Sequence, residues 1–228
     1  EIGYEVEIVP AEPGAFDMTF AANASYPFAR KPGERRVLLS RMAHAERAAE
    51  PEAYGRWFEA RGYEVHRLPE GAGTLEGAGD LVRSPLGDVV YGGHGFRTTI
   101  EALRAAEAVL GVPVVPLKLV DARFYHLDTA LAVLDEARVM YVEEAFDRPS
   151  VETIRSRFRR PLRIPVDEAA GAFACNAHCP DGRNVLIESS CPGARKLLAD
   201  EGFRVRPLET SEFRKAGGSV FCLKAELP

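Results

Sequence analysis

The sequence predicts an α/β fold made of repeated units arranged around a common axis. Five segments share one pattern. Each begins with a short strand-like run that contains or adjoins a proline, continues through a polar stretch, and ends at a residue whose side chain can take part in catalysis or binding. These residues follow one another at steps of 53, 50, 50 and 46 positions: Asn23, Glu76, His126, Asn176 and Cys222. A repeat of this length indicates that one structural unit recurs along the chain. The five polar residues would then lie at equivalent positions on one face of the molecule. The segments span 7–24, 66–80, 115–129, 162–177 and 205–223.

A second pattern of strand, helix and strand lies between these segments. Strands are expected at 37–40, 89–93, 139–146 and 185–190, and the helices that follow them at 51–62, 99–111, 150–158 and 192–202. Strands return at 63–69, 112–120, 161–166 and 203–209. A helical crossover lets two strands lie parallel, so four small α/β units are predicted.

The beginning of the chain breaks this rule. Residues 1–6 and 7–10 both resemble strands, but no helix separates them, and a parallel crossover needs about a dozen residues. We expect residues to be missing between Val6 and Glu7, the alternative being a degenerate fifth unit. Ring closure by pairing of residues 222–227 with the first strand is also open. The repeats run from end to end, so one domain is expected over 1–228.

Composition narrows the class of protein. The chain has 228 residues, of which 46% are hydrophobic, and a net charge of −5, which disfavours nucleic acid as a partner. The one basic cluster, at 155–163, is interpreted as a solvated helix end. No apolar run approaches 18 residues, so no membrane span is expected, and the first residues do not resemble a signal peptide. Four cysteines in a chain of this length suggest reduced thiols and a cytoplasmic setting.

Cys222 is the best candidate for a nucleophile. A thiolate is the reactive form and needs a base or a positive field nearby. Its local sequence, VFCL, is apolar and by itself favours a buried core cysteine. Its position in the repeat, equivalent to those of the other four polar residues, instead favours a role as the nucleophile. Gly217 and Gly218 precede it and would allow the backbone to approach a ligand closely.

His126 is the candidate general acid and base, because histidine titrates near neutral pH. It lies in the sequence FYHLDT, which we interpret as a strand end. Alternation along an extended chain would place His126 and Asp128 on the same face.

Glu76 and Asp80 lie four residues apart in TLEGAGD and predict a tight acidic loop. A divalent cation would need further oxygen ligands that the sequence does not supply. A carboxylate in this loop would repel phosphate, which disfavours a nucleotide site. The sequence CNAHC at 175–179 lacks the second ligand pair of a structural zinc site. No cofactor and no metal are therefore expected.

These residues together favour one class of substrate. Three carboxylates around a thiol suit a planar cation with many N–H donors, and a guanidinium group fits this description. Glu76, Asp80 and Asp128 would hold the cation while the thiolate attacks its carbon atom.

Several motifs resemble those of the guanidino-group-modifying enzymes, the pentein superfamily. They are FAANA, LLSRMAHAER, LEGAGD, GFRT, FYHLDT, FACNA and SEFRKAGGS, and the likeness covers about residues 16 to 223. The chain is most similar to the branch of arginine dihydrolases and dimethylarginine hydrolases. The resemblance implies a five-bladed α/β propeller with pseudo-fivefold ββαβ repeats.

The resemblance also implies roles for individual residues. Cys222 would attack the guanidinium carbon to give a covalent thiouronium adduct, and His126 would shuttle protons with Glu76 beside it. Asp80 and Asp128 would bind the guanidino nitrogens, and Asn23 would face the substrate. Arg47, in the HAER motif, would bind the α-carboxylate of an arginine-like substrate.

Three alternatives remain open at this point: an amidinotransferase, a hydrolase acting on the ureido group of citrulline, and a scaffold without activity. Members of this branch usually open with an Asn-Pro-Trp-Met stretch that the chain lacks, which puts one wall of the substrate pocket in doubt. A homodimer is compatible with the sequence. No residue decides which arginine derivative is the substrate, and Asn176 receives no role.

Overall fold

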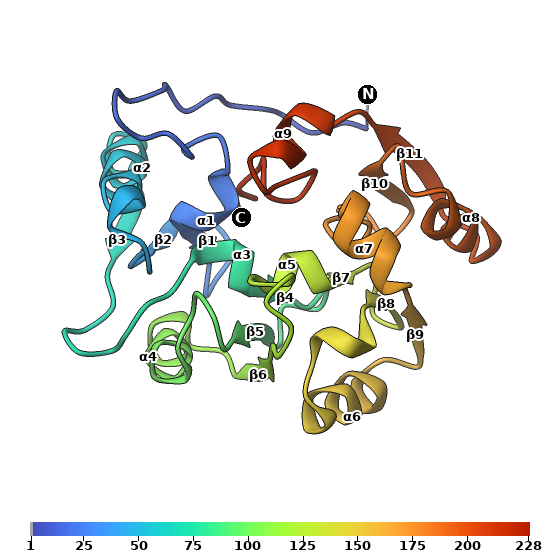
Figure 1. Ribbon diagram of the computed structural model, residues 1–228. Helices are drawn as coiled ribbons and strands as arrows, with labels where there is room; N and C mark the ends of the chain where they lie inside the picture. The colour runs from blue at the N-terminus through green and yellow to red at the C-terminus, as the bar shows by residue number, and fades with distance from the viewer. Residues whose placement is uncertain (1) are drawn as a thin grey trace.

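The strands of the structure, a computed structural model that describes residues 2–228, form four small sheets that follow one another along the chain (Figure 1). Three sheets have three strands each, in the orders β1-β2-β3, β4-β5-β6 and β7-β8-β9, and the fourth consists of β10 and β11. Helices and strands alternate, so the predicted mixed α/β class is confirmed.

Each three-stranded sheet is built in the same way. Its first strand pairs antiparallel with the second, and a helix crosses over to a third strand that pairs parallel with the second. In the first sheet these elements are β1 (Ser25–Phe28), β2 (Arg36–Leu39), α2 (Glu50–Glu59) and β3 (Glu64–His66). In the second they are β4 (Leu81–Arg83), β5 (Val90–His94), α4 (Ile100–Leu110) and β6 (Val114–Lys118). In the third they are β7 (Leu131–Val133), β8 (Arg138–Tyr141), α6 (Arg148–Arg157) and β9 (Arg160–Arg163).

The fourth sheet keeps the crossover alone. Its elements are β10 (Asn184–Glu188), α8 (Pro192–Asp200) and β11 (Arg204–Leu208), and the two strands are parallel. An isolated bridge between His178 and Leu186 stands where the other sheets have their first strand. All four predicted crossovers are present. The basic cluster is confirmed as an exposed helix end, since Arg155 and Arg157 lie in the last turn of α6.

Very short helices precede the first strand of each three-stranded sheet. They are α1 (Ala21–Ala24), α3 (Gly77–Asp80) and α5 (Leu127–Ala130), and α7 (Val166–Ala172) lies before the fourth sheet. The remaining elements are the 3-10 turns at Ala45–Arg47 and Glu143–Ala145 and the helix α9 (Ser211–Lys215). Figure 1 shows α1, α3 and α5 side by side near the middle, with α2, α4, α6 and α8 on the outside.

Three sequence-based expectations about local structure are wrong. His126 does not end a strand but is the N-cap of α5, so Asp128 lies in a helical turn and not across an extended chain. Asp80 lies in the helix α3 and not in a loop. Residues 2–10 form no strand, and neither do residues 222–227, so these two segments do not pair; Glu1 lies outside the described residues.

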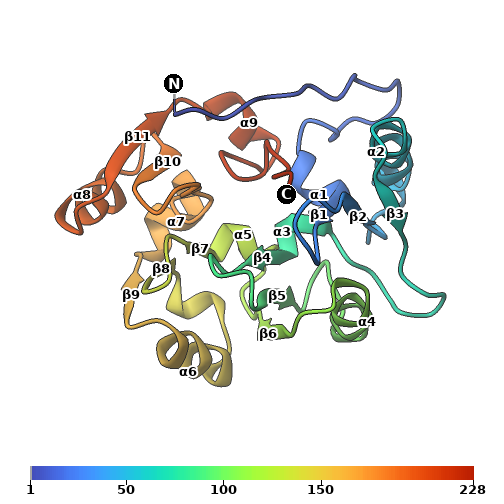
Figure 2. The same ribbon diagram turned by 180° about the vertical axis from the view of Figure 1, so that it is seen from behind.

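The N-terminal segment instead crosses the open side between the fourth sheet and the first. It starts beside β10 and β11 and runs past α9 to α2 (Figures 1 and 2). Tyr4 Oη donates to the carbonyl of Pro180 at 2.9 Å, and Arg61 Nε donates to Glu7 Oε2 at 2.8 Å. Val6 and Ile8 stay 83% and 84% exposed, so this segment leaves apolar surface uncovered.

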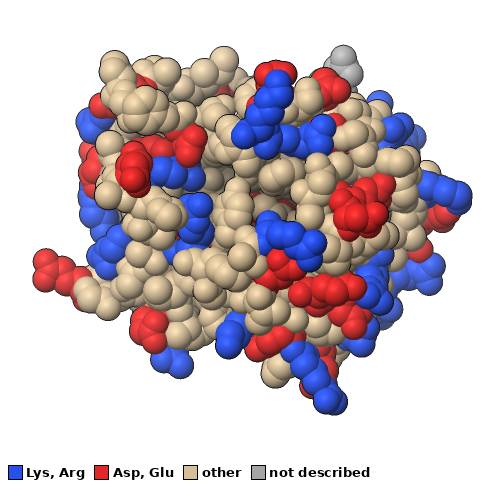
Figure 3. Space-filling view, in the orientation of Figure 1, with Lys and Arg blue, Asp and Glu red and all other residues tan. Residues whose placement is uncertain are grey.

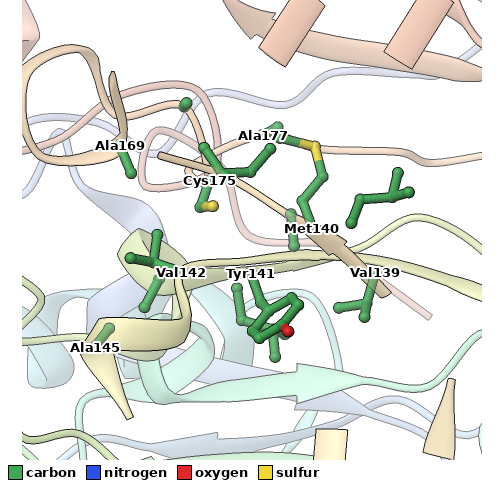
Figure 4. Close-up of a cluster of buried hydrophobic side chains, with 14 of the residues drawn as sticks. Val139, Met140, Tyr141, Val142, Ala145, Ala169, Cys175 and Ala177 are labelled. Atoms are coloured by element: carbon green, nitrogen blue, oxygen red, sulfur yellow. The ribbon is translucent and has the colours of Figure 1, made fainter. Parts of the chain in front are cut away.

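The buried apolar side chains of the described residues form three clusters. The largest joins the second, third and fourth units, and Figure 4 shows Met140, Val142, Cys175 and Ala177 within it. Of the other two, one joins the first and second units and one lies in the first unit. Cys175 is therefore a core residue. Within residues 2–228 no helix is long and apolar enough to cross a membrane.

Candidate active site

The short inner helices enclose a cavity on one face of the molecule. The N–H of Ala22 in α1 donates to the carbonyl of Cys222 at 3.1 Å, which ties the last segment of the chain to the first helix. Figure 3 shows this face hollowed near its middle, where α1, α3 and α5 meet in Figure 1. The cavity has a volume of about 330 Å³ and is lined by Asp17, Phe20, Asn23, His44, Glu46, Arg47, Arg97, Tyr125, His126, Ala216, Gly217 and Cys222.

The thiol of Cys222 lies at the bottom of this cavity and is 3% exposed. Its Sγ is 3.1 Å from Asp128 Oδ2, to which it donates, and 3.1 Å from Asn176 Nδ2, which donates to it. Burial raises the pKa of the thiol well above its usual value, and the charge of Asp128 raises it further. The backbone of Ser219 and the amide of Asn176 act against this shift. Burial and the charge of Asp128 thus both favour the neutral thiol.

His126 forms a buried ion pair with Glu76. The distance from His126 Nε2 to Glu76 Oε2 is 2.6 Å, and the other carboxylate oxygen accepts from the N–H of Ala43 at 3.0 Å. A carboxylate only accepts hydrogen bonds, so Nε2 carries the proton. Burial would lower the pKa of His126, but Asp80, Glu76 and Asp128 outweigh it and the net shift is upward.

The ion pair with His126 also shifts the pKa of Glu76, in the opposite direction. Burial would raise it, but the hydrogen bond and the charge of His126 lower it to about 2, with help from Ala43 and Arg97. Both shifts favour the charged pair, an imidazolium beside a carboxylate.

Asp80 lies behind the cavity lining and uses both carboxylate oxygens within the protein. Oδ1 accepts from the N–H of Leu127 at 2.9 Å, and Oδ2 accepts from Thr98 Oγ1 at 2.7 Å. Burial raises its pKa to about 6. Asp80 thus fixes the start of α5 beside His126, and its expected contact with substrate stays a prediction.

Two buried polar atoms at the site have no partner among the residues that the structure describes. They are Asp128 Oδ1 and Asn23 Nδ2. Asp128 is 1% exposed and Asn23 2% exposed, so water cannot easily take the place of a partner. The unpaired acceptor belongs to the carboxylate that holds the thiol, and the unpaired donor belongs to a residue that lines the cavity, so both favour a polar ligand.

Arg47 lines the cavity and is held firmly by other residues. Nη2 and Nε donate to the carboxylate of the fully buried Glu50 at 2.7 and 2.9 Å, and Nη1 donates to Asn23 Oδ1 at 3.1 Å. Its expected contact with an α-carboxylate stays a prediction.

The sequence analysis missed Arg97 and Tyr125. Arg97 Nη1 lies 3.3 Å from Glu76 Oε2, and its guanidinium carbon lies 4.9 Å from the centre of the Tyr125 ring. Tyr125 Oη donates to the carbonyl of Gly217 at 2.7 Å and so holds the turn before Cys222. Arg97 stands three residues before α4, as Arg47 stands three residues before α2. This repeat equivalence was a signal that could have found Arg97.

The structure brings together the residues predicted to act on substrate. Cys222, Asn23, Arg47 and His126 line one cavity, and Glu76, Asp80 and Asp128 stand directly behind them. Asn176, which had no expected role, touches the thiol. Gly217 adopts a left-handed backbone conformation, with φ of 93°, and lines the cavity. Gly218 is needed for a different reason: its backbone packs against the ring of Phe20, and a Cβ atom at this position would lie 2.3 Å from that ring.

Comparison with known proteins identifies relatives over nearly the whole chain. The N(G),N(G)-dimethylarginine dimethylaminohydrolase of Mycobacterium tuberculosis is 37% identical over 99% of this chain and 71% of its own length. The bifunctional arginine dihydrolase/ornithine cyclodeaminase ArgZ of a Synechocystis strain is 38% identical over 96% of this chain, which spans 30% of that protein. No family model matches the chain.

Solved structures agree with these relatives. The N-terminal domain of ArgZ, solved with a covalently bound reaction intermediate, has a TM-score of 0.85 and 34% identity over 95% of this chain and 77% of that one. A dimethylarginine dimethylaminohydrolase solved as an adduct with S-methyl-L-thiocitrulline has a TM-score of 0.76 and 26% identity, covering 93% of this chain and 77% of that one. The family expected from the motifs is confirmed: the chain belongs to the dimethylarginine dimethylaminohydrolase and arginine dihydrolase branch of the pentein superfamily.

Proposed function

We propose that the protein is a cysteine-dependent hydrolase that acts on the guanidino group of arginine or an N-methylated arginine. One observation carries this proposal. The thiol of Cys222 stands 3.1 Å from Asp128, a buried carboxylate whose other oxygen has no partner within residues 2–228, and it shares its cavity with the ion-paired His126. A planar cation would complete this arrangement.

Binding of a guanidinium group would activate the thiol. N–H groups of the cation would donate to Asp128 Oδ1 and neutralise the charge that now raises the pKa of Cys222. The positive field of the substrate would in turn stabilise the thiolate. The nucleophile would thus form only when its target is present.

The reaction would proceed through a covalent adduct. The thiol proton of Cys222 passes to solvent when the cation binds, and Sγ attacks the guanidinium carbon to form a C–S bond. The C–N bond to the leaving nitrogen breaks as His126 gives that nitrogen a proton. Ammonia or an alkylamine departs and leaves a thiouronium group on the sulfur. Water then loses one proton to His126 and attacks the same carbon. The C–S bond breaks to release a ureido product and the thiolate, and the second proton of the water passes to solvent.

Arg47 and Arg97 would bind the α-carboxylate of the substrate. Both guanidinium groups line the cavity, and each is held by a buried carboxylate, Glu50 or Glu76. A planar guanidinium group can bind a carboxylate through two parallel hydrogen bonds.

We further propose that the four sheets and a fifth, incomplete unit form a five-bladed α/β propeller with its site on the axis. The fifth unit would comprise the N-terminal segment and the residues around Cys222. Residues 1–228 would then form a single catalytic domain. The four cysteines are free thiols, which supports a reducing, cytoplasmic setting.

Incubation with arginine, methylated arginines and citrulline tests the function. Wild-type protein is expected to release ammonia or an alkylamine and to form citrulline or ornithine. Cys222→Ala should lose at least about 10³-fold in kcat, because no nucleophile remains. Cys179→Ala is the matched control, since this thiol is half-buried and lies outside the cavity.

Three results would contradict the proposal. One is equal turnover by Cys222→Ala and wild type, and another is an absence of product with every substrate. The third is product that appears only after an amine acceptor is added, which would indicate a transferase. Mass spectrometry of acid-quenched wild-type protein should show an adduct on the peptide that contains Cys222.

A further inference from the structure

The nearly identical pentapeptides FAANA (20–24) and FACNA (173–177) place their asparagines in different surroundings. Asn23 accepts from Arg47 and leaves its Nδ2 unpaired beside the cavity. Asn176 is fully buried, does not line the cavity and uses both ends of its amide within the protein. The two positions are equivalent in the repeat, but only Asn176 contacts the nucleophile.

The backbone of the last segment fixes the orientation of the Asn176 amide. Its Oδ1 accepts from the N–H of Phe221 at 3.0 Å and from the N–H of Cys222 at 3.3 Å. A flipped amide would point its own N–H groups at these two donors. Nδ2 is therefore directed at the carbonyl of Asp128, at 3.2 Å, and at Cys222 Sγ, at 3.1 Å.

The two side chains on Sγ act differently once the thiol loses its proton. An ionised Asp128 can only accept a hydrogen bond, so a thiolate would lose this contact and face a negative charge. Asn176 donates through Nδ2, and this bond becomes charge-assisted when the sulfur is negative. The thiolate is also the leaving group when water cleaves the adduct, so the same donor would act in both halves of the reaction.

We propose that Asn176 is the positioning residue of the nucleophile: one side-chain amide holds the backbone of residues 221 and 222 and donates a hydrogen bond to Sγ. This role rests on the proposed function of Cys222. It assigns Asn176 to the reacting sulfur, whereas Asn23 serves the substrate side of the cavity. Asn176 does not reach the substrate and acts through Cys222.

The test compares two variants of similar size. Asn176→Asp keeps an acceptor for the two backbone N–H groups but replaces the donor on Sγ with an oxygen. Asn176→Leu removes the donor without adding charge. At pH 9 the rate of Cys222 alkylation by iodoacetamide, followed by mass spectrometry, should fall about tenfold to a hundredfold in both. This range corresponds to the loss of a hydrogen bond to a charged group.

Kinetics separate positioning from substrate binding. In whichever variants fold, kcat for the guanidino substrate should fall by a similar factor while KM changes less than about threefold. Asn184→Asp is the matched control, because this asparagine is also buried in the fourth unit but bonds to Asp181 and Arg206. It should leave the alkylation of Cys222 unchanged.

Folded variants that alkylate and turn over at the wild-type rate would overturn the proposal. If neither variant folds, hydrogen exchange of the Asn176 side-chain amide tests the proposal in proteins that keep Asn176. One Hδ2 of Asn176 should be protected from exchange in wild type and lose this protection in Cys222→Ala. Equal protection in the two proteins would overturn the proposal. Alkylation and exchange need no turnover, so a failure of the proposed function, seen as inactive wild type, is distinguishable from a failure of the Asn176 assignment.

Discussion

Glu76 and Asp80 are both buried beside His126 but respond to burial in opposite ways. The hydrogen bond and charge of His126 overcome burial and lower the pKa of Glu76 to about 2. Asp80 has weaker compensation, and burial raises its pKa to about 6. Glu76 is therefore charged throughout the physiological range, whereas Asp80 changes its charge within it. Glu76 is therefore a constantly charged partner of His126, whose pKa is also raised by Asp80 and Asp128.

Glu76→Gln should shift the pH dependence of activity. Removing one of the carboxylates that raise the pKa of His126 lets burial lower it, so the alkaline limb of kcat should move to lower pH. A kcat profile from pH 5 to 9 and an NMR titration of His126 would measure this shift. Glu64→Gln, which removes the exposed partner of His66, should leave the limb in place.

The same substitution should change acid stability in a defined window. The folded pKa of Glu76 lies below its usual 4.5, so its contribution to stability is complete above that pH and is lost as the pH falls towards 2. Glu76→Gln should be less stable than wild type at pH 6, and the difference should shrink below pH 4. A constant difference between pH 6 and 3 would contradict the assignment.

Gly218→Ala should damage the cavity without touching the thiol. Its Cβ would lie 2.3 Å from Cε1 of Phe20, which is 4% exposed and lines the cavity, so the ring or the turn must move. Overpacking of this kind costs about 1–3 kcal/mol of unfolding free energy. Urea denaturation and KM measurements should both show the change. Gly171→Ala, in α7, meets open space and should be neutral or stabilising.

At the level of elements, the single-turn helices place the site residues. Glu76 and His126 are the N-caps of α3 and α5, and Asn23 lies in α1. The sequence could not predict these helices, because four residues are too few to show helical periodicity. The turn of α5 also depends on a tertiary contact, the bond from the Leu127 N–H to Asp80. The longer helices α2, α4, α6 and α8 were predicted correctly because they are long enough to show their pattern.

Thr98→Val should loosen α3 in a pH-dependent way. The buried Thr98 hydroxyl donates to Asp80 Oδ2 at 2.7 Å and accepts from the N–H of Glu76 at 3.1 Å, so it joins the two ends of α3. The hydrogen bond from Thr98 favours the ionised form of Asp80. Loss of this bond should therefore lower the free energy of unfolding more above pH 6 than below it. The cost should be about 1–3 kcal/mol at pH 7.5.

Urea denaturation at pH 7.5 and at pH 5 would measure this difference. Thr153→Val is the control, because its hydroxyl bonds only to the carbonyl of Pro149 at 2.9 Å within its own helix. An equal loss of stability at both pH values would show that Asp80 does not respond to Thr98.

At the level of the whole molecule, the N-terminal segment is the part that the sequence predicted least well. Residues 2–10 have the composition of strands, but strand propensity is expressed only where a neighbouring strand accepts the pairing. No described strand pairs with them, so they run as an extended segment. Tyr4, Val6 and Ile8 are then 55%, 83% and 84% exposed.

Proteolysis should attack this segment first. Its ion pairs, Glu7 with Arg61 and Glu12 with Arg56, are partly exposed and will be screened by salt. Glutamyl endopeptidase is expected to cleave after Glu5 or Glu7 before any other site, and several-fold faster in about 0.5 M than in about 0.05 M NaCl. Mass spectrometry of early products would identify the cuts, and a free peptide of residues 2–14 would correct for the effect of salt on the protease.

First cleavage elsewhere, for example after Glu70, would contradict this expectation. Arg61→Gln should weaken the effect of salt, because one of the two ion pairs is already absent.

The sequence predicted the crossovers and several residues at the cavity, because both recur at the repeat period. Cys222, His126, Glu76 and Asn23 were singled out in this way. Arg97 was missed although it stands in the repeat as Arg47 does, whereas Tyr125 and the role of Asn176 depend on which side chains meet across units. The amide of Asn176 reaches a sulfur 46 residues away, and no local pattern contains that contact.

The two asparagine pentapeptides also have an evolutionary meaning. Each unit supplies its own residue to the site from an equivalent position in the repeat, so a mutation in one copy need not disturb the others. FAANA and FACNA differ at a single position, yet one amide faces the cavity and the other holds the sulfur. A duplicated turn of this kind can acquire a new task by local substitution, so that one scaffold can diversify its chemistry one repeat at a time.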